Sequence, residues 1–488
     1  MEVVNEAEGE SINCYTCFVG GEMKKFSVIM VCCFLLMASL AGCSRNKGAK
    51  GTKGGVTGCK DLQRQSEPEQ DVKPHTGGQH MSQAISTDSG KKGSSEIVKS
   101  EAIDEEEKKI QEILGAMTLE EKAGQVFIAA FRTDEQNHPM HVLDNRTRQQ
   151  IEQYHLGGVI LFGENIDSIS QTQKLIEDMQ AAAKIPLFIA VDEEGGRVSR
   201  LNSSTKMPAT KLPGNKVLGE TNDPQLAYEV GVLLGQELSS LGFNMNLAPV
   251  ADVNTNPRNK VIGDRSFGSD AEKVGEMAGA MVKGMQAQNM SAVLKHFPGH
   301  GDTILDTHEE TVVLNHDMER MEQLEFLPFI KGIQAGADGV MTAHIQMPGI
   351  AEEGVPATLS QEILTGILRN RLHHEQLIIT DALEMGAISR HWTAEQAVVR
   401  AFNAGADILL MPVSLQEAYQ GLLKAVQNGQ ISEKRLDESV IRILRIKYKR
   451  KILERTEPSL DPEIILGSEQ HQRLVRKIYE KAGQKNGK

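Results

Sequence analysis

The chain has 488 residues, 40% of them hydrophobic, and a formal net charge of -13. This length is sufficient for a large hydrophobic core and for one to three domains. The excess of negative charge argues against a general nucleic-acid binder, since such proteins use positive charge to displace counterions from phosphates.

The first candidate element is a secretory leader. Met23, Lys24 and Lys25 precede an apolar run at residues 26–41, which is too short for a comfortable membrane span. The run ends in LAGC at residues 40–43, which resembles the lipobox of bacterial lipoproteins. The resemblance implies that Cys43 is lipidated and tethers an extracytoplasmic protein to the bacterial cell membrane; a plain anchor helix is the alternative. Because residues 1–22 fit no signal, translation is expected to begin at Met23.

The composition changes after the leader. Residues 44–104 are rich in Gly, Ser, Lys and acidic residues and have almost no large apolar side chains, so we expect a disordered linker. All six cysteines lie in the first 59 residues, and we therefore expect neither disulfides nor thiolate ligands beyond them. The predicted organisation is a leader at 1–43, the linker at 44–104, a folded domain at 105–455 and a C-terminal tail at 456–488.

The folded domain alternates apolar runs with amphipathic segments. Eight runs have the near-continuous apolar character of strands buried on both faces, at 126–130, 158–162, 187–191, 246–250, 292–295, 339–343, 377–381 and 408–411. Helical patterns separate them, at 166–183, 224–241, 271–288, 317–335, 361–371 and 394–404. Eight strands that alternate with helical segments of this size predict a (β/α)8 barrel of the TIM type.

Polar residues follow the predicted strands at the end where barrel enzymes carry their active sites. In chain order they are Asp192, Asp252, Lys295, His296, His344 and Asp381. Several of these residues have a simpler interpretation as well. Asp192 precedes Gly-Gly and could be a turn former, Asp252 could cap a proline-bracketed loop, and His344 and His300 could be hydrogen-bonded wall residues. The interpretation of Asp381 as functional is stronger, because a charge at the end of a buried strand is costly without a role or a partner.

The loop after the fifth strand contains the largest number of candidate catalytic side chains. Its sequence is KHFPGHGDTILDTH at residues 295–308, with Gly299 and Gly301 allowing it to move. If Asp381 is a nucleophile, it needs an acid/base partner across the cleft. His308 suits that role, because a carboxylate two residues away, Asp306, can fix its tautomer and raise its basicity. This is the arrangement of a retaining glycosidase in which a His–Asp pair replaces the usual carboxylic acid.

The sequence resembles the family 3 glycoside hydrolases, specifically the bacterial β-N-acetylhexosaminidases, over residues 113–453. The matching motifs are MTLEEKAGQ at 117–125, GGVILF at 157–162, DEEGGRVSRL at 192–201, LAPVADVN at 247–254, DRSFG at 264–268, KHFPGHGDT at 295–303, DTH at 306–308 and TD at 380–381. Together these motifs are highly specific.

The resemblance implies a role for particular residues. Asp381 would be the nucleophile and His308 the acid/base, oriented by Asp306. The residues expected to hold the terminal N-acetylglucosamine are Asp192, Arg200, Arg265, Lys295 and His296. Two positions depart from the family pattern, with Glu193 in place of the usual Gln and Ala382 in place of a frequent second Asp. Neither is expected to touch the assigned chemistry, although both could adjust the pocket.

The predicted activity is removal of terminal N-acetylglucosamine from peptidoglycan fragments. Aromatic residues are 4% of the chain and Trp392 is the only tryptophan. Few aromatic side chains are therefore available to stack against the sugars of a long polysaccharide. No cofactor or metal is expected, because an acid and a nucleophile suffice. A family 3 β-glucosidase and a phosphorylase, in which phosphate replaces water, are alternatives. A non-catalytic sugar-binding lipoprotein is a third.

Two further hypotheses concern histidines and basic residues. A metallohydrolase on the same barrel could use His296, His300, Asp302 and His308 as ligands. The basic stretch at residues 442–455 has Ile and Leu at helical spacing, and we interpret it as the solvated face of a helix.

Overall fold

The computed structural model describes residues 105–304, 312–455 and 459–483. These residues belong to one compact unit of the chain, residues 86–488. The leader, Cys43 and the predicted linker lie outside the described residues, as do Asp306 and His308. Within the described ranges, no helix is both long and apolar enough to traverse a lipid bilayer.

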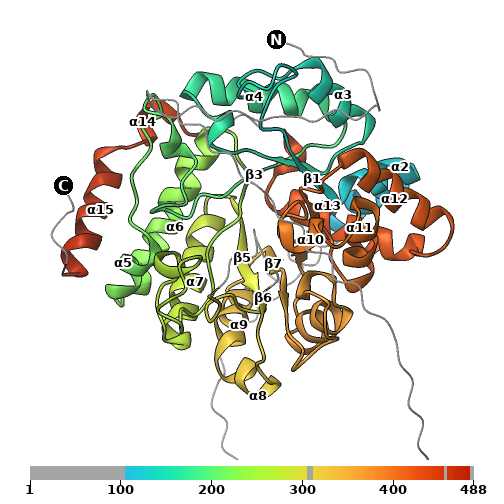
Figure 1. Cartoon of the computed structure of the whole chain (residues 1–488). Coiled ribbons are helices and arrows are strands. Elements are labelled where there is room, and N and C mark those ends of the chain that lie inside the picture. Colours follow the sequence, from blue (N-terminus) through green and yellow to red (C-terminus); the bar gives the residue numbers. More distant parts are fainter. Residues whose placement is uncertain (1–104, 305–311, 456–458, 484–488) are drawn as a thin grey trace, which may run out of the picture. The chain divides into compact units, whose positions relative to one another are not determined.

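Eight parallel strands form the centre of the structure (Figure 1). They are β1 Phe127–Ala130, β2 Gly158–Ile160, β3 Phe188–Val191, β4 Met245–Asn246, β5 Ser291–Phe297, β7 Gly339–Thr342, β9 Leu377–Ile379 and β10 Leu409–Leu410. Their order follows the chain, and β10 pairs with β1. A parallel bridge between Ile379 and Ile408 closes the ring, with Thr380 N donating to the carbonyl of Ile408 over 3.0 Å. The (β/α)8 prediction is confirmed.

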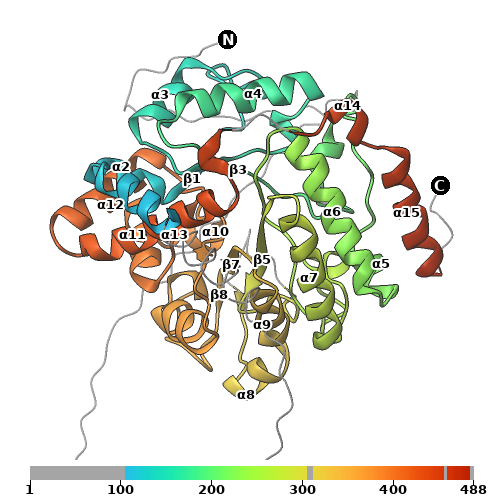
Figure 2. The ribbon, with the colours of Figure 1, turned by 180° about the vertical axis from the view of Figure 1, so that it is seen from behind.

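Helices separate the strands around this barrel (Figures 1 and 2). The connections between successive strands hold α3 Asn145–Gln153, α4 Ile169–Ala182, α5 Asn215–Glu220, α6 Pro224–Ser240, α7 Ala271–Gln286, α9 Phe326–Gln334, a π-helix at Glu362–Arg371, α10 Gly386–Ser389 and α11 Ala394–Ala404, and α12 Leu415–Gln427 and α13 Glu433–Lys449 follow β10. Local caps explain several starts: Asp223 caps α6 ahead of Pro224, and Thr393 and Gln396 form a capping box on α11.

The strands differ from the predictions mainly at their ends. β4 has only two residues, because Pro249 follows soon after and has no backbone N–H for a ladder. β5 runs on to Phe297, so Lys295 and His296 lie within the strand. β9 ends at Ile379, and Asp381 therefore lies in the turn after the strand instead of at its last position. The predicted helix at 317–335 is broken into α8 Met318–Arg320, a π-helical turn and α9.

The prediction of a solvated basic helix at residues 442–455 is wrong for several of its side chains. Lys447 is fully buried and Arg450 is 8% exposed. Arg450 forms an ion pair with Asp338, just before β7, and Arg442 forms one with Asp407, just before β10. Since both aspartates precede their strands, α13 is tied to the amino-terminal end of the barrel, opposite the predicted site.

The C-terminal segment packs on the outer helices. It contains α14 Pro462–Ile465 and α15 Glu469–Lys481, and both contact α6, beside which they lie in the two ribbon views. The buried carboxylate of Glu237 on α6 explains this contact. It accepts from the backbone N–H of Gly467 over 3.1 Å and lies 2.8 Å from His471 Nδ1.

Candidate active site

A pocket of about 490 Å³ opens at the carboxyl ends of the strands. Its lining includes six of the eight predicted catalytic and sugar-binding residues: Asp192, Arg200, Arg265, Lys295, His296 and Asp381. These six come from four separate strand–loop connections. The two others, Asp306 and His308, lie outside the described residues.

The pocket floor is a network of buried charges. Lys295 Nζ donates to Asp192 Oδ1 and lies the same 2.6 Å from Glu194 Oε1. Arg265 holds both oxygens of Glu194, with Nε at 2.9 Å from one and Nη2 at 2.8 Å from the other. Burial alone would raise the pKa of Glu194, but Arg265 and Lys295 hold it well below its usual range. Glu194 is therefore an anion that neutralises two cations.

Glu194 was missed in the sequence, where it was one of two glutamates after Asp192. A signal for it exists in the alternation of an extended chain, which points residues two apart toward the same side. Asp192 and Glu194 both face the pocket, whereas Glu193 does not line it. Lys295 and Arg265 also require a buried carboxylate nearby, because a buried charge without a partner is strongly destabilising.

His296 is fixed by Asp252. Its Nδ1 lies 2.7 Å from Asp252 Oδ2, and its backbone N–H points to the same carboxylate. Burial would raise the pKa of Asp252, but His296 and His300 lower it. Nε2 of His296 faces the pocket side, 3.2 Å from Arg265 Nη2. Asp252 is therefore a positioning group, which the sequence left open between a loop cap and a site residue.

Two further histidines brace the walls, as one interpretation of the sequence expected. His300 Nδ1 lies 2.9 Å from Thr303 Oγ1, and burial, with His296 nearby, lowers the pKa of His300 to about 4. His344 Nδ1 lies 2.8 Å from Thr358 Oγ1 and its Nε2 lies 2.9 Å from the carbonyl of Ala382. His344 thus holds the backbone directly after Asp381.

The turn that carries Asp381 is held from β7 as well. Asp381 N donates to Thr342 Oγ1 over 3.4 Å, and Thr342 Oγ1 lies 2.8 Å from Thr358 Oγ1. Asp381 Oδ1 accepts from the N–H of Ala382 over 2.8 Å. The carboxylate therefore projects into the pocket from a backbone that two neighbouring elements support.

Arg200 reaches the pocket through a glycine turn. Gly195 and Gly196 have φ of 88° and 57°, which favour glycine. Arg200 Nη2 lies 3.7 Å from Asp192 Oδ2, and its guanidinium lies 5.4 Å from the centre of the Phe162 ring. The side chain is thus directed to the carboxylate of Asp192.

Glu193 stabilises the backbone of this turn. It is buried, and its Oε2 accepts from the backbone N–H groups of Arg200 and Leu201 over 2.7 and 3.1 Å. Burial raises the pKa of Glu193 to about 7 in spite of these bonds. Glu193 therefore fixes the backbone of a pocket residue, in agreement with the expectation that this position adjusts the pocket.

The described ligands of the metallohydrolase hypothesis have separate partners. His296 bonds to Asp252, His300 to Thr303, and Asp302 lies 3.1 Å from His316. In the described ranges, no three histidine, cysteine, aspartate or glutamate side chains are grouped to bind a metal ion.

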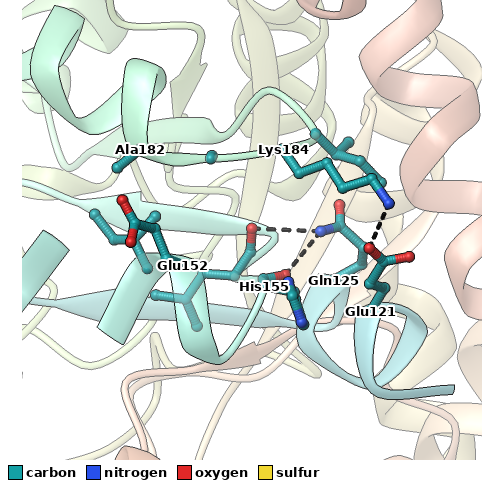
Figure 3. A pocket seen from close by; sticks show the side chains of 10 residues that line it. Glu121, Gln125, Glu152, His155, Ala182 and Lys184 are labelled. Carbon is teal, nitrogen blue, oxygen red and sulfur yellow. Dashed lines mark hydrogen bonds and ion pairs between the residues drawn. The ribbon is translucent and has the colours of Figure 1, made fainter. Parts of the chain in front are cut away.

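A smaller cavity lies at the opposite end of the barrel (Figure 3). Gln125 precedes β1 and donates through Nε2 to the carbonyl of His155 over 2.8 Å, and Lys184 pairs with Glu121 over 2.5 Å at its edge. Oε1 of Gln125 accepts from Lys447 Nζ over 2.9 Å. This cavity shares no residue with the pocket that contains Asp381.

A closed barrel of parallel strands with a charged pocket at their carboxyl ends is the layout of a TIM-barrel enzyme. Residues 118–446 match the model of the glycosyl hydrolase family 3 N-terminal domain, and the chain belongs to this family.

Named relatives agree with this membership. Beta-hexosaminidase A of Pseudoalteromonas piscicida is 37% identical over 368 residues, covering 70% of this chain and 60% of the relative. The chain thus spans less than two thirds of that protein's length. Beta-hexosaminidase of Hydrogenovibrio crunogenus is 36% identical over 290 residues, covering 58% of this chain and 79% of the relative. A family 3 beta-N-acetylglucosaminidase structure from Paenibacillus sp. str. FPU-7 superposes with a TM-score of 0.71 at 39% identity, covering 75% of this chain and 69% of that one.

Proposed function

We propose that the chain is a retaining exo-β-N-acetylglucosaminidase that acts through a glycosyl intermediate on Asp381. The observation that carries the proposal is the meeting of six motif residues in one pocket at the strand ends of a family 3 barrel. The relatives named beta-hexosaminidase support N-acetylglucosamine as the sugar released and make β-glucosidase activity the less favoured alternative.

In the first step, the carboxylate of Asp381 attacks the anomeric carbon while an acid protonates the departing oxygen. His308, oriented by Asp306, is the proposed acid. In the second step, His308 takes a proton from water as the water displaces Asp381, which restores the enzyme and retains the β configuration. Hydrolysis by this route needs no redox step and no cofactor.

The floor network is suited to a sugar. Asp192 accepts from sugar hydroxyls, whereas Lys295, Arg265 and Arg200 donate to them, and charged partners make such hydrogen bonds stronger. Because these groups are already paired with one another, they are held in place before the sugar arrives. This arrangement reduces the entropy cost of positioning the substrate.

We further propose that the natural substrates are peptidoglycan fragments and that Cys43 carries a lipid anchor on the outside of the cell membrane. The LAGC sequence before the linker supports the anchor. Metabolic labelling with a fatty-acid analogue, compared between the whole chain and its Cys43→Ala variant, tests it. Label that persists in the variant contradicts lipidation at Cys43.

The activity is tested with matched 4-nitrophenyl β-glycosides of N-acetylglucosamine and glucose. The proposal predicts faster release from the first, and Asp381→Gly should abolish it. His308→Ala should slow glycosides with poor leaving groups far more than aryl glycosides. Equal losses of rate on both kinds of glycoside would show that His308 is not the acid. Formation of sugar 1-phosphate in phosphate buffer would favour phosphorolysis over hydrolysis.

A further inference from the structure

The pocket has a second set of charged residues, at its mouth, which the sequence motifs do not include. These charged residues are Arg132 and Glu384, which line the pocket with the floor residues, and Phe162 of the GGVILF motif lies beside Arg132. Arg132 Nη2 lies 3.2 Å from Glu384 Oε1, and the two side chains are 43% and 40% exposed. Lys295 on the floor is 2% exposed, so the charged groups of this pocket range from deeply buried to open to solvent.

The backbones that carry this pair are fixed, although the side chains are open. The carbonyl of Arg132 accepts from Met140 N over 3.0 Å, and that of Phe131 accepts from Asn165 Nδ2 over 2.8 Å. The N–H of Glu384 donates to the carbonyl of Met411 over 3.0 Å. The two side chains therefore start from fixed backbone positions, one after β1 and the other after β9, and meet at the mouth.

The guanidinium of Arg132 is also oriented. It lies 4.1 Å from the centre of the Phe162 ring, close enough for a cation–π contact. The contact takes up the face of the guanidinium and leaves its in-plane N–H donors available. One of these donors meets Glu384, which shows that a carboxylate fits at this position.

The leaving group of an exo-acting glycosidase must lie at the mouth. In the proposed function the terminal sugar occupies the floor beside Asp381, and the bond to be cleaved points out of the pocket. An exposed ion pair such as Arg132–Glu384 contributes little stability, because water screens its charges. A ligand carboxylate can therefore replace Glu384 on Arg132 at little cost.

We propose that Arg132 selects substrates whose leaving group carries a carboxylate, and that Glu384 opposes them when it does not move aside. This inference rests on the proposed function and adds the chemical class of the leaving group. The two residues should have opposite effects, because Arg132 attracts the ligand's charge and Glu384 repels it.

The test uses two substrates with leaving groups of similar acidity, 4-nitrophenyl and 3-carboxy-4-nitrophenyl β-N-acetylglucosaminide. The readout is the ratio of kcat/KM for the carboxylated substrate to that for the neutral one, measured on the same preparation so that any unfolded fraction cancels. Arg132→Gln should lower this ratio by up to about fivefold, as expected for one exposed charge pair, and added salt should shrink the effect. Glu384→Gln should raise the ratio.

Arg473→Gln is the matched control, since Arg473 is an exposed arginine on α15, away from the pocket. It should leave the ratio unchanged. An Arg132→Gln variant with an unchanged ratio, or a Glu384→Gln variant with a lowered one, overturns the inference but not the proposed function. If the unaltered protein releases N-acetylglucosamine from neither substrate, the proposed function fails and the inference fails with it.

Discussion

The ammonium of Lys295 lies 2.6 Å from Glu194 Oε1 on the floor of the pocket, and both side chains are almost fully buried. The same carboxylate binds Arg265 through two oxygens. One buried anion therefore balances two buried cations, and Asp192 is the other acid in contact with Lys295. The geometry of the floor depends on the charge of Glu194.

Glu194→Gln should lower both activity and stability. The substitution keeps the shape but leaves Arg265 and Lys295 with too little negative charge, and breaking a buried ion pair typically costs about 3–5 kcal/mol. We expect kcat/KM to fall about a hundredfold or more and the free energy of unfolding in urea to fall by a few kcal/mol. The exposed residue Glu353 provides the control, Glu353→Gln, which should change neither quantity. Unaltered kcat/KM in Glu194→Gln would show that the floor does not need this anion.

Asp252→Asn should weaken substrate binding through His296. The carboxylate sets the orientation of the imidazole through the 2.7 Å contact with Nδ1, and an amide can present either a donor or an acceptor there. The loss of one positioning hydrogen bond predicts a fall in kcat/KM of about tenfold, mainly through KM. Steady-state kinetics measure this split. A fall confined to kcat would contradict a role in placing His296 for binding.

Glu193 should make stability depend on pH below neutrality. Burial raises its pKa from 4.5 to about 7 in the folded protein, so the folded state binds the proton more tightly than the unfolded state. The resulting stabilisation is fully present below pH 4.5 and is lost as the pH rises through 7. Glu193→Gln removes the titration and keeps an acceptor for the N–H groups of Arg200 and Leu201. The free energy of unfolding of the unaltered protein, relative to this variant, should decline by on the order of 3 kcal/mol between pH 5 and 8. A constant difference would contradict the buried titration.

Lys447 should make the free energy of unfolding rise with pH in the alkaline range, which is opposite to the effect of Glu193. Burial lowers its pKa from 10.5 to about 7, and its ammonium lies 2.9 Å from Gln125 Oε1 and 5.1 Å from the centre of the Phe188 ring. The folded state favours the neutral amine of Lys447. The stability that this preference contributes is fully present above pH 10.5 and is lost as the pH falls through 7. Lys447→Met should therefore be more stable than the unaltered protein at pH 7 by a few kcal/mol, and this advantage should shrink toward pH 10. Urea unfolding at intervals from pH 7 to 10 measures it. An advantage of constant size across that range would show that Lys447 does not titrate within it.

The sequence predicted the barrel because its strands are buried on both faces and therefore appear as apolar runs. The sequence could not give the residues at which the strands end, because these ends depend on hydrogen bonds between neighbouring strands. Asp381 illustrates this: the apolar pattern runs up to it, but the pairing of β9 with β7 stops at Ile379. Asp192, Lys295 and Asp381 were found because they lie near the ends of strands, which the barrel brings together. Arg200 and Arg265 were identified only through the family resemblance.

The residues that the sequence did not reveal depend on contacts between distant segments. Arg132 and Glu384 are separated by most of the barrel in the chain, and no spacing rule pairs them. Lys447 appeared as part of a solvated basic face, because periodicity gives the apolar side of a helix but not which polar side chain the barrel covers. For Glu193 the sequence suggested only an adjustment of the pocket, because its effect depends on burial and on its hydrogen bond to the backbone of Arg200.

The central claim is that Asp381 forms a covalent bond to the sugar. The most direct measurement is the intact mass of the protein after incubation with a 5-fluoro β-N-acetylglucosaminide that has an activated leaving group, followed by peptide mapping. We predict a mass increase of one fluorosugar, located on Asp381 and absent from Asp381→Asn. A protein that releases the leaving group without any adduct, or an adduct on another residue, would contradict the account.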